Sequence, residues 1–115
     1  MRETILLVED EPVLCHLMEG VLEASGFTVV TAANLEEAFA HLEGREPFHV
    51  LVADLHLETE SSVPFIEQAC TRDPSLRVIV TTGGECSTPD LPWLVLEKPF
   101  RPSELVAAVC RVLSQ

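Results

Sequence analysis

The stretch His49–Leu57, with the sequence HVLVADLHL, decides how the rest of this chain is expected to fold. Its apolar run Val50–Ala53 consists of strand-forming residues and is typical of a strand buried on both faces of a parallel sheet. The run ends at a carboxylate, Asp54, which therefore lies at the carboxyl end of the predicted strand. Ligands of open α/β sheets bind at that edge, so Asp54 is the first candidate for a functional residue.

The composition is that of one acidic domain. The chain of 115 residues has room for a single core, and 7 basic against 19 acidic side chains give a formal charge of −12. We therefore expect one domain over residues 1–115, without an output domain, and no direct binding to nucleic acid, whose phosphates would be repelled. The apolar run Ile5–Val8 is too short for a signal peptide or a membrane span. We accordingly expect a cytoplasmic location and no membrane association.

Apolar strands alternate with amphipathic helices along the chain. We expect strands at about 4–8, 27–31, 50–53, 77–81 and 93–96, and helices at about 12–25, 34–43, 63–71 and 102–113. Strands joined through helices run parallel with right-handed connections, so the pattern predicts a doubly wound α/β sheet. The fourth crossover is the exception. Residues 85–92 include two prolines and are too few for a typical helix, so we expect a loop or a single turn there.

Polar side chains follow four of the predicted strands: Glu9 and Asp10 the first, Asp54 the third, Thr82 the fourth and Lys98 the fifth. Because parallel strands end at the same edge, we expect these side chains to meet there. Three neighbouring carboxylates favour a hard cation such as Mg²⁺, or Mn²⁺ in its place. A hydroxyl and an ammonium suit the oxygens of a phosphoryl group. Each residue alone has an ordinary structural explanation, but together they predict a phosphoryl-transfer site with Asp54 as acceptor.

Four motifs together resemble the receiver domain of two-component response regulators. They are ILLVEDEP (5–12), LVADLHL (51–57), VIVTTG (78–83) and EKPFRPSEL (97–105), and the resemblance covers nearly the whole chain. It implies a flavodoxin-like, doubly wound, five-stranded parallel sheet with strand order 2-1-3-4-5. It also suggests the subgroup with a Thr-Gly motif after the fourth strand, in which the fourth helix is short or absent.

The resemblance implies a metal site at the edge of the sheet. Glu9 and Asp10 would help to hold Mg²⁺, directly or through water. A carboxylate oxygen of Asp54 and the backbone carbonyl of His56 would be further ligands.

The resemblance also implies the reaction. Asp54 would accept a phosphoryl group from a phosphohistidine of a histidine kinase or a histidine phosphotransfer protein. Thr82 would contact the group, Lys98 would pair with it, and the Lys98–Pro99 peptide bond would be cis. The domain would catalyse only its own phosphorylation and dephosphorylation, and would change its binding to a downstream protein as a result.

The sequence departs from the receiver pattern at several positions. Val95 stands where an aromatic residue usually couples to the hydroxyl residue, and Glu58 and Ser62 stand where a proline and a glycine are usual. Because of Val95 and the shortened fourth crossover, an interaction module that works without phosphorylation stays open as an alternative. A small aspartate-nucleophile phosphatase is a weaker alternative, because His56 replaces the second acid of such enzymes and a chain of this length leaves no room for a substrate-recognition cap.

Overall fold

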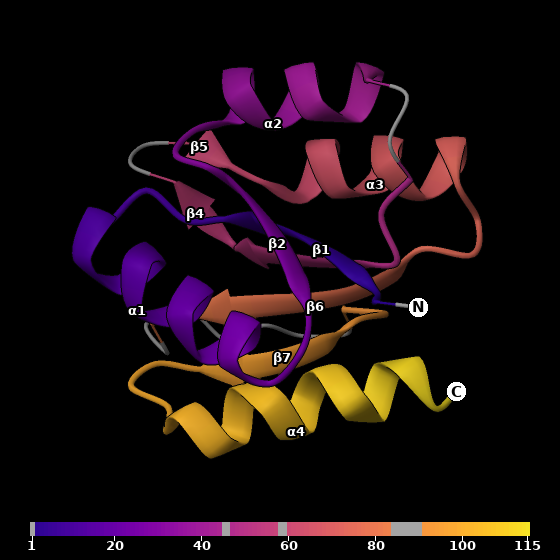
Figure 1. Ribbon diagram of the computed structural model, residues 1–115. Coiled ribbons are helices and arrows are strands. Elements are labelled where there is room, and N and C mark those ends of the chain that lie inside the picture. The colour runs from indigo at the N-terminus through magenta and orange to yellow at the C-terminus, as the bar shows by residue number, and fades with distance from the viewer. Residues whose placement is uncertain (1, 45–46, 58–59, 84–90) are drawn as a thin grey trace.

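The computed structural model describes residues 2–44, 47–57, 60–83 and 91–115. In this part of the chain one five-stranded parallel sheet has the order β2-β1-β3-β6-β7, with helices on both faces (Figure 1). This arrangement confirms the predicted doubly wound fold and its strand order. The strands of the sheet are β1 (Thr4–Val8), β2 (Thr28–Ala32), β3 (Val50–Asp54), β6 (Arg77–Thr82) and β7 (Leu94–Glu97). The helices are α1 (Pro12–Ala24), α2 (Leu35–Glu43), α3 (Val63–Arg72) and α4 (Pro102–Leu113).

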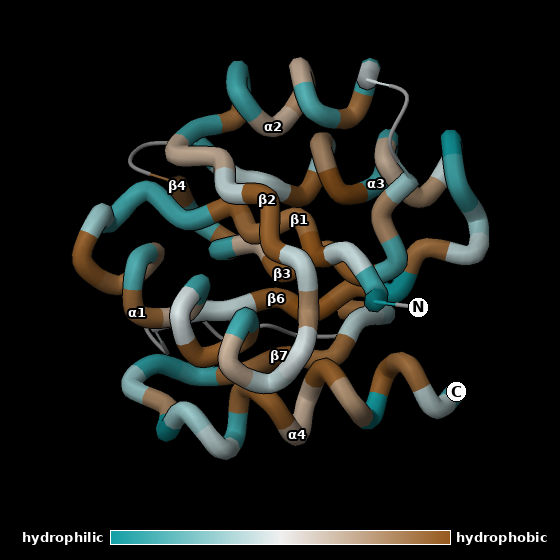
Figure 2. The backbone as a smooth tube through the Cα atoms, viewed as in Figure 1, coloured by the Kyte–Doolittle hydropathy of each residue, from teal (hydrophilic) through white to brown (hydrophobic). Residues whose placement is uncertain are grey.

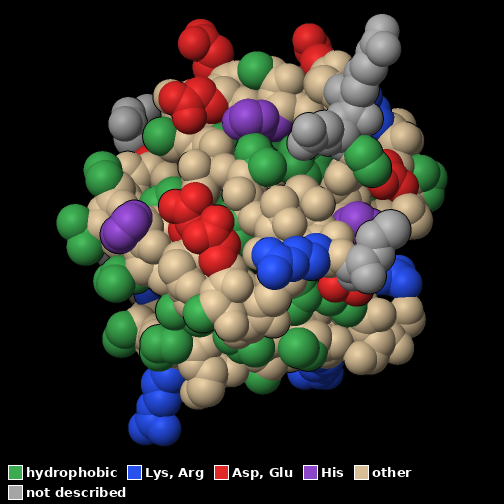
Figure 3. Space-filling view, viewed as in Figure 1, with side chains coloured by type: hydrophobic (Ala, Val, Ile, Leu, Met, Phe, Trp, Pro, Cys, Tyr) green, Lys and Arg blue, Asp and Glu red, His purple; other side chains and the backbone are tan. Residues whose placement is uncertain are grey.

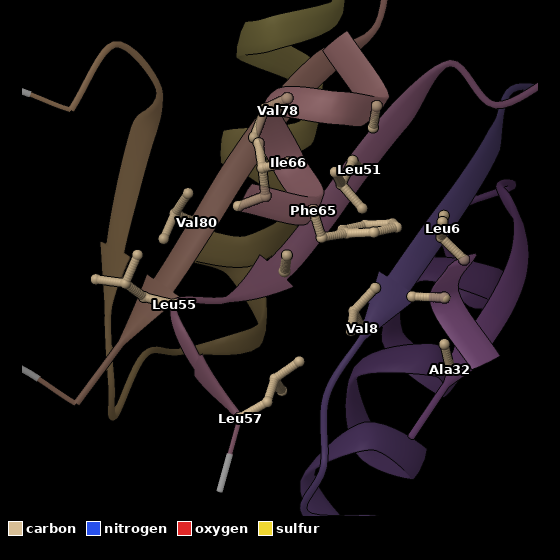
Figure 4. Packing of buried hydrophobic residues seen from close by; sticks show 13 residues of the cluster. Leu6, Val8, Ala32, Leu51, Leu55, Leu57, Phe65, Ile66, Val78 and Val80 are labelled. Carbon is tan, nitrogen blue, oxygen red and sulfur yellow. The ribbon is translucent and has the colours of Figure 1, made fainter. Parts of the chain in front are cut away.

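Alternation of side chains along the strands divides the core into two layers. On β6, Val78 and Val80 pack with residues of α2 and α3, whereas Ile79 packs with residues of α1 and α4. Figure 2 shows the hydrophobic residues concentrated along the strands. In the first layer Phe65 of α3 lies over β1 and β3 (Figure 4), and its ring meets that of Phe39 edge-on at 4.9 Å between centroids. All five residues of β3 are buried, as predicted for a central strand.

The helix ends follow the local signals of the sequence. After α1, Gly26 has a φ of 100°, a left-handed conformation that side chains with a Cβ rarely adopt. Before α2, the Asn34 side chain accepts the Glu37 N–H at 2.8 Å, and the Glu37 carboxylate accepts the Ala33 N–H at 2.9 Å. These two reciprocal hydrogen bonds form a capping box at the start of α2. Acidic side chains gather over α2 at the top of Figure 3.

One segment corrects the sequence analysis. The sequence pattern predicts no strand between the strand at about 50–53 and the helix at about 63–71, but β5 (Glu60–Ser61) pairs antiparallel with β4 (His56–Leu57). The pairing returns the chain to the end of β3, where the Ser62 N–H donates to the Leu55 carbonyl at 2.9 Å. Segments of two residues are too short to show an alternating pattern, so the sequence carried no signal for this ribbon.

The loop or single turn predicted at residues 85–92 falls, apart from Leu91 and Pro92, outside the described residues. Four helices are present in the part of the chain that the structure describes. None of the helices among those residues combines the length and the apolar character needed to cross a membrane.

Candidate functional site

The five strand-end residues of the sequence analysis lie along one edge of the sheet. Glu9 and Asp10 directly follow β1, Asp54 ends β3, Thr82 ends β6 and Lys98 follows β7. These strands are neighbours in the order β1-β3-β6-β7, so their carboxyl ends are adjacent. Between the neighbouring strands β6 and β7, the backbone N–H of Lys98 donates to the Thr82 carbonyl at 2.7 Å. This bond ties the residue after β7 to the end of β6.

The three carboxylates form a compact cluster. One oxygen each from Glu9, Asp10 and Asp54 lie within 4.8 Å of one another. Glu9 is 1% exposed and Asp54 is 7% exposed, whereas Asp10 is partly exposed. Such a cluster opens to solvent on the side of Asp10 and is closed on the side of Glu9.

Lys98 bridges two of these acids. Its Nζ lies 2.9 Å from Asp54 Oδ2 and 3.0 Å from Glu9 Oε1. Burial favours the neutral amine, but the hydrogen bond to Asp54 and the proximity of Glu9 outweigh it, so the pKa of Lys98 is raised above its ordinary value. For Glu9, burial raises the pKa although the nearby Lys98 ammonium opposes it. One ammonium therefore faces three carboxylates, and the cluster has an excess of negative charge.

The donor set fits Mg²⁺. Carboxylate oxygens are the ligands that this ion prefers, and it retains water on its open side. Glu9 Oε1 is buried, lies 3.0 Å from the Lys98 ammonium, and receives no well-aligned hydrogen bond from a described group. Its lone pairs are available to a ligand. Asp10 and Asp54 would supply the further oxygens.

The backbone after Asp54 is tied to the acceptor itself. The His56 N–H donates to Asp54 Oδ1 at 3.2 Å, and the Leu55 N–H donates to the Thr81 carbonyl at 2.8 Å. His56 therefore begins β4 beside the acceptor, with its side chain exposed. The role of the His56 carbonyl as a metal ligand stays a prediction.

Two other predictions concern β7 and the residue after it. The Lys98–Pro99 peptide bond is cis, as predicted. Val95 pairs with Val80 in the sheet, and by alternation its side chain lies on the same face as Thr82. The aliphatic side chain thus occupies the position from which an aromatic ring would reach toward Thr82.

Sequence reasoning missed one residue near the site. Ser62 is 0% exposed, and its hydroxyl donates to the Leu55 carbonyl at 3.2 Å. The only signal was a serine at the position where receivers usually carry glycine.

Fold and site together define a class of protein: a doubly wound α/β domain whose strand ends gather an acidic cluster and one lysine around a buried aspartate. Residues 5–91 match the model of the response regulator receiver domain family. The chain belongs to this family.

Two curated relatives illustrate the similarity. A probable transcriptional regulator, ycf27 of Porphyridium aerugineum, is 32% identical over 97% of this chain and 48% of its own length. The photosynthetic apparatus regulatory protein RegA of Cereibacter sphaeroides is 34% identical over 71% of this chain and 44% of its own. The chain therefore spans about half the length of the curated relatives it matches.

Solved structures show the same fold. A response regulator receiver domain protein (CheY-like) from Methanospirillum hungatei JF-1 superposes with a TM-score of 0.88 at 24% identity, covering 99% of this chain and 95% of that one. A response regulator protein from Burkholderia pseudomallei, solved with a phosphorylated aspartic acid, calcium ion and citrate, superposes with a TM-score of 0.81 at 27% identity. That match covers 97% of this chain and 71% of the other.

Proposed function

We propose that this receiver domain accepts a phosphoryl group on Asp54 from a phosphohistidine, in a reaction that depends on Mg²⁺, and that phosphorylation changes its binding to a downstream protein. The observation that carries the proposal is the environment of Asp54. Its Oδ2 lies 2.9 Å from Lys98 Nζ, while one of its oxygens lies within 4.8 Å of oxygens of Glu9 and Asp10.

The chemistry follows from these contacts. An oxygen of Asp54 attacks the phosphorus, the bond between phosphorus and the donor's imidazole nitrogen breaks, and its electron pair returns to the imidazole. Mg²⁺ held by Glu9, Asp10, Asp54 and the His56 carbonyl would supply positive charge for the phosphoryl oxygens. Lys98 already contacts the acceptor and can pair with a phosphoryl oxygen once the acceptor loses its own charge. Thr82 is the expected hydroxyl contact.

The donor in this proposal is a histidine kinase or a histidine phosphotransfer protein, in the cytoplasm. The domain is not an enzyme for external substrates, since its acceptor reacts once and must be dephosphorylated before it reacts again. The Burkholderia pseudomallei relative supports the proposal, because its structure contains a phosphorylated aspartic acid. Whether the chain passes the group on to another histidine protein or acts directly on a target is decided by an assay of reverse transfer.

Intact mass spectrometry tests the proposal. Wild type, Asp54→Asn and Asp73→Asn are incubated with acetyl phosphate, with and without Mg²⁺, and then with a phosphorylated histidine kinase. Asp73, which follows α3 and accepts hydrogen bonds from Ser75, is a matched control away from the cluster. We expect one added phosphoryl group in wild type and Asp73→Asn, only with Mg²⁺, and none in Asp54→Asn. Addition to Asp54→Asn, or no addition to wild type from either donor, would refute the proposal.

A further inference from the structure

Ser62 occupies a helix-capping position without capping the helix. It is the N-cap residue of α3, and serine at such a position usually accepts an N–H of the first turn. Here the side chain makes no capping hydrogen bond, and the hydroxyl donates to the Leu55 carbonyl at 3.2 Å. The Ser62 N–H donates to the same carbonyl at 2.9 Å. A fully buried hydroxyl is thus directed at one carbonyl beside the phosphoacceptor.

That carbonyl belongs to the peptide group that contacts Asp54. The Leu55 carbonyl and the His56 N–H are parts of one planar unit, so neither can turn without the other. The His56 N–H donates to Asp54 Oδ1 at 3.2 Å. A hydrogen bond accepted by a peptide carbonyl also polarises the N–H of the same group and strengthens the bond it donates. Ser62 is therefore connected to Asp54 through a single rigid peptide.

We propose that Ser62 is a positioning residue for the phosphoacceptor. Its hydroxyl holds the Leu55–His56 peptide in the orientation that aligns the Asp54 carboxylate. The same hydrogen bond fixes the backbone N–H of His56, and the carbonyl of this residue is an expected metal ligand. The inference rests on the proposed phosphorylation of Asp54 and adds a residue to that reaction. Glycine, the usual residue here in receivers, has no hydroxyl, so this bond is a feature of the present chain.

The test compares two serines of the same segment. Ser62→Ala removes the hydroxyl but keeps the backbone N–H bond to Leu55. Ser61→Ala is the matched control, because the exposed Ser61 hydroxyl accepts the Val63 N–H at 3.2 Å and belongs to the helix start instead. Urea unfolding first verifies that both variants are folded. The rate of phosphorylation by acetyl phosphate with Mg²⁺ is then followed by intact mass.

We expect Ser62→Ala to react about fivefold more slowly than wild type, which corresponds to roughly 1 kcal/mol, the usual net contribution of one hydrogen bond. Ser61→Ala should stay within about twofold of wild type on the same scale. A second readout separates positioning from general loosening of the fold. The amide proton of His56, observed by NMR without phosphate or metal, should shift upfield in Ser62→Ala and stay in place in Ser61→Ala.

The outcomes decide whether Ser62 positions Asp54. If wild type is phosphorylated and Ser62→Ala reacts at the wild-type rate, the positioning role is wrong and the proposed function stands. If both serine variants are slowed equally and the His56 amide does not move, the effect is a general one and the positioning role is again wrong. If wild type accepts no phosphoryl group from acetyl phosphate or from a histidine kinase, the proposed function fails and the positioning role fails with it.

Discussion

Replacing Lys98 by methionine removes the cation that contacts both Glu9 and Asp54. Lys98 is the only lysine in the sequence, and methionine keeps the apolar length of the side chain without its charge. The two carboxylates would then remain close together at a largely buried position. We expect the variant to be strongly destabilised near neutral pH when no divalent cation is present.

The magnitude follows from the two distances. At 2.9 Å and 3.0 Å between Lys98 Nζ and the two carboxylate oxygens, each Coulomb attraction is roughly 5.5 kcal/mol at an effective dielectric constant of about 20. The desolvation of the Lys98 ammonium, on a side chain that is only 21% exposed, offsets much of this attraction. Removing one partner of a buried pair generally costs about 3–5 kcal/mol. We therefore expect Lys98→Met to lower the free energy of unfolding by that amount.

The loss of unfolding free energy in Lys98→Met should be larger at neutral pH than at acidic pH. Burial already raises the pKa of Glu9 above its ordinary value of 4.5, and loss of Lys98 would raise it further. Protonation of Glu9 relieves the repulsion, so the deficit of the variant should shrink as the pH falls from neutral toward 4.5. The pKa of Lys98 is raised above 10.5, so its contribution to wild type is complete below that pH and is lost only as the pH rises through the higher folded-state value.

Urea unfolding at pH 8 and at pH 5, monitored by the fluorescence of Trp93, measures how much unfolding free energy Lys98→Met loses relative to wild type. Arg72→Met, at an exposed position in the last turn of α3, is a control that should change stability by less than about 1 kcal/mol. A double variant with Glu9→Gln should recover part of the loss. A deficit below about 1 kcal/mol at pH 8, or one that is the same at both pH values, would refute the electrostatic reasoning.

Two further predictions concern Glu9 and the start of α2. Because burial raises the pKa of Glu9, its ionised form lowers stability, so Glu9→Gln should unfold at a higher temperature than wild type near neutral pH without metal. Mg²⁺ at ten times its Kd should raise the free energy of unfolding of wild type by about 1.4 kcal/mol, and that of Glu9→Gln by clearly less. Calorimetry measures both changes. Asn34→Ala should lose about 1 kcal/mol in urea unfolding through loss of the bond to the Glu37 N–H, and an unchanged midpoint would contradict this capping role.

Much of this fold was readable from local patterns. A run such as Val50–Ala53 can avoid water only as a central strand, and Gly26 or Asn34 mark helix ends through properties of a single residue. The observed β1 has the predicted bounds, Thr4–Val8, while each of the other four strands of the sheet differs by one residue at one or both ends. Such small differences arise because terminal hydrogen bonds depend on the neighbouring strand, which a single segment does not reveal.

The sequence by itself determined which side chains gather at the carboxyl edge, because parallel strands necessarily present their carboxyl ends on one side. The side chains at these ends are Glu9, Asp10, Asp54, Thr82 and Lys98. Only the tertiary structure decided how those groups contact one another. The bridge from Lys98 to two acids and the link from Ser62 through a peptide to Asp54 join residues that are distant in the chain or separated by a turn. Hydrogen bonds and ion pairs act over about 3 Å, so they depend on the folded path of the backbone and leave no periodic trace in the sequence.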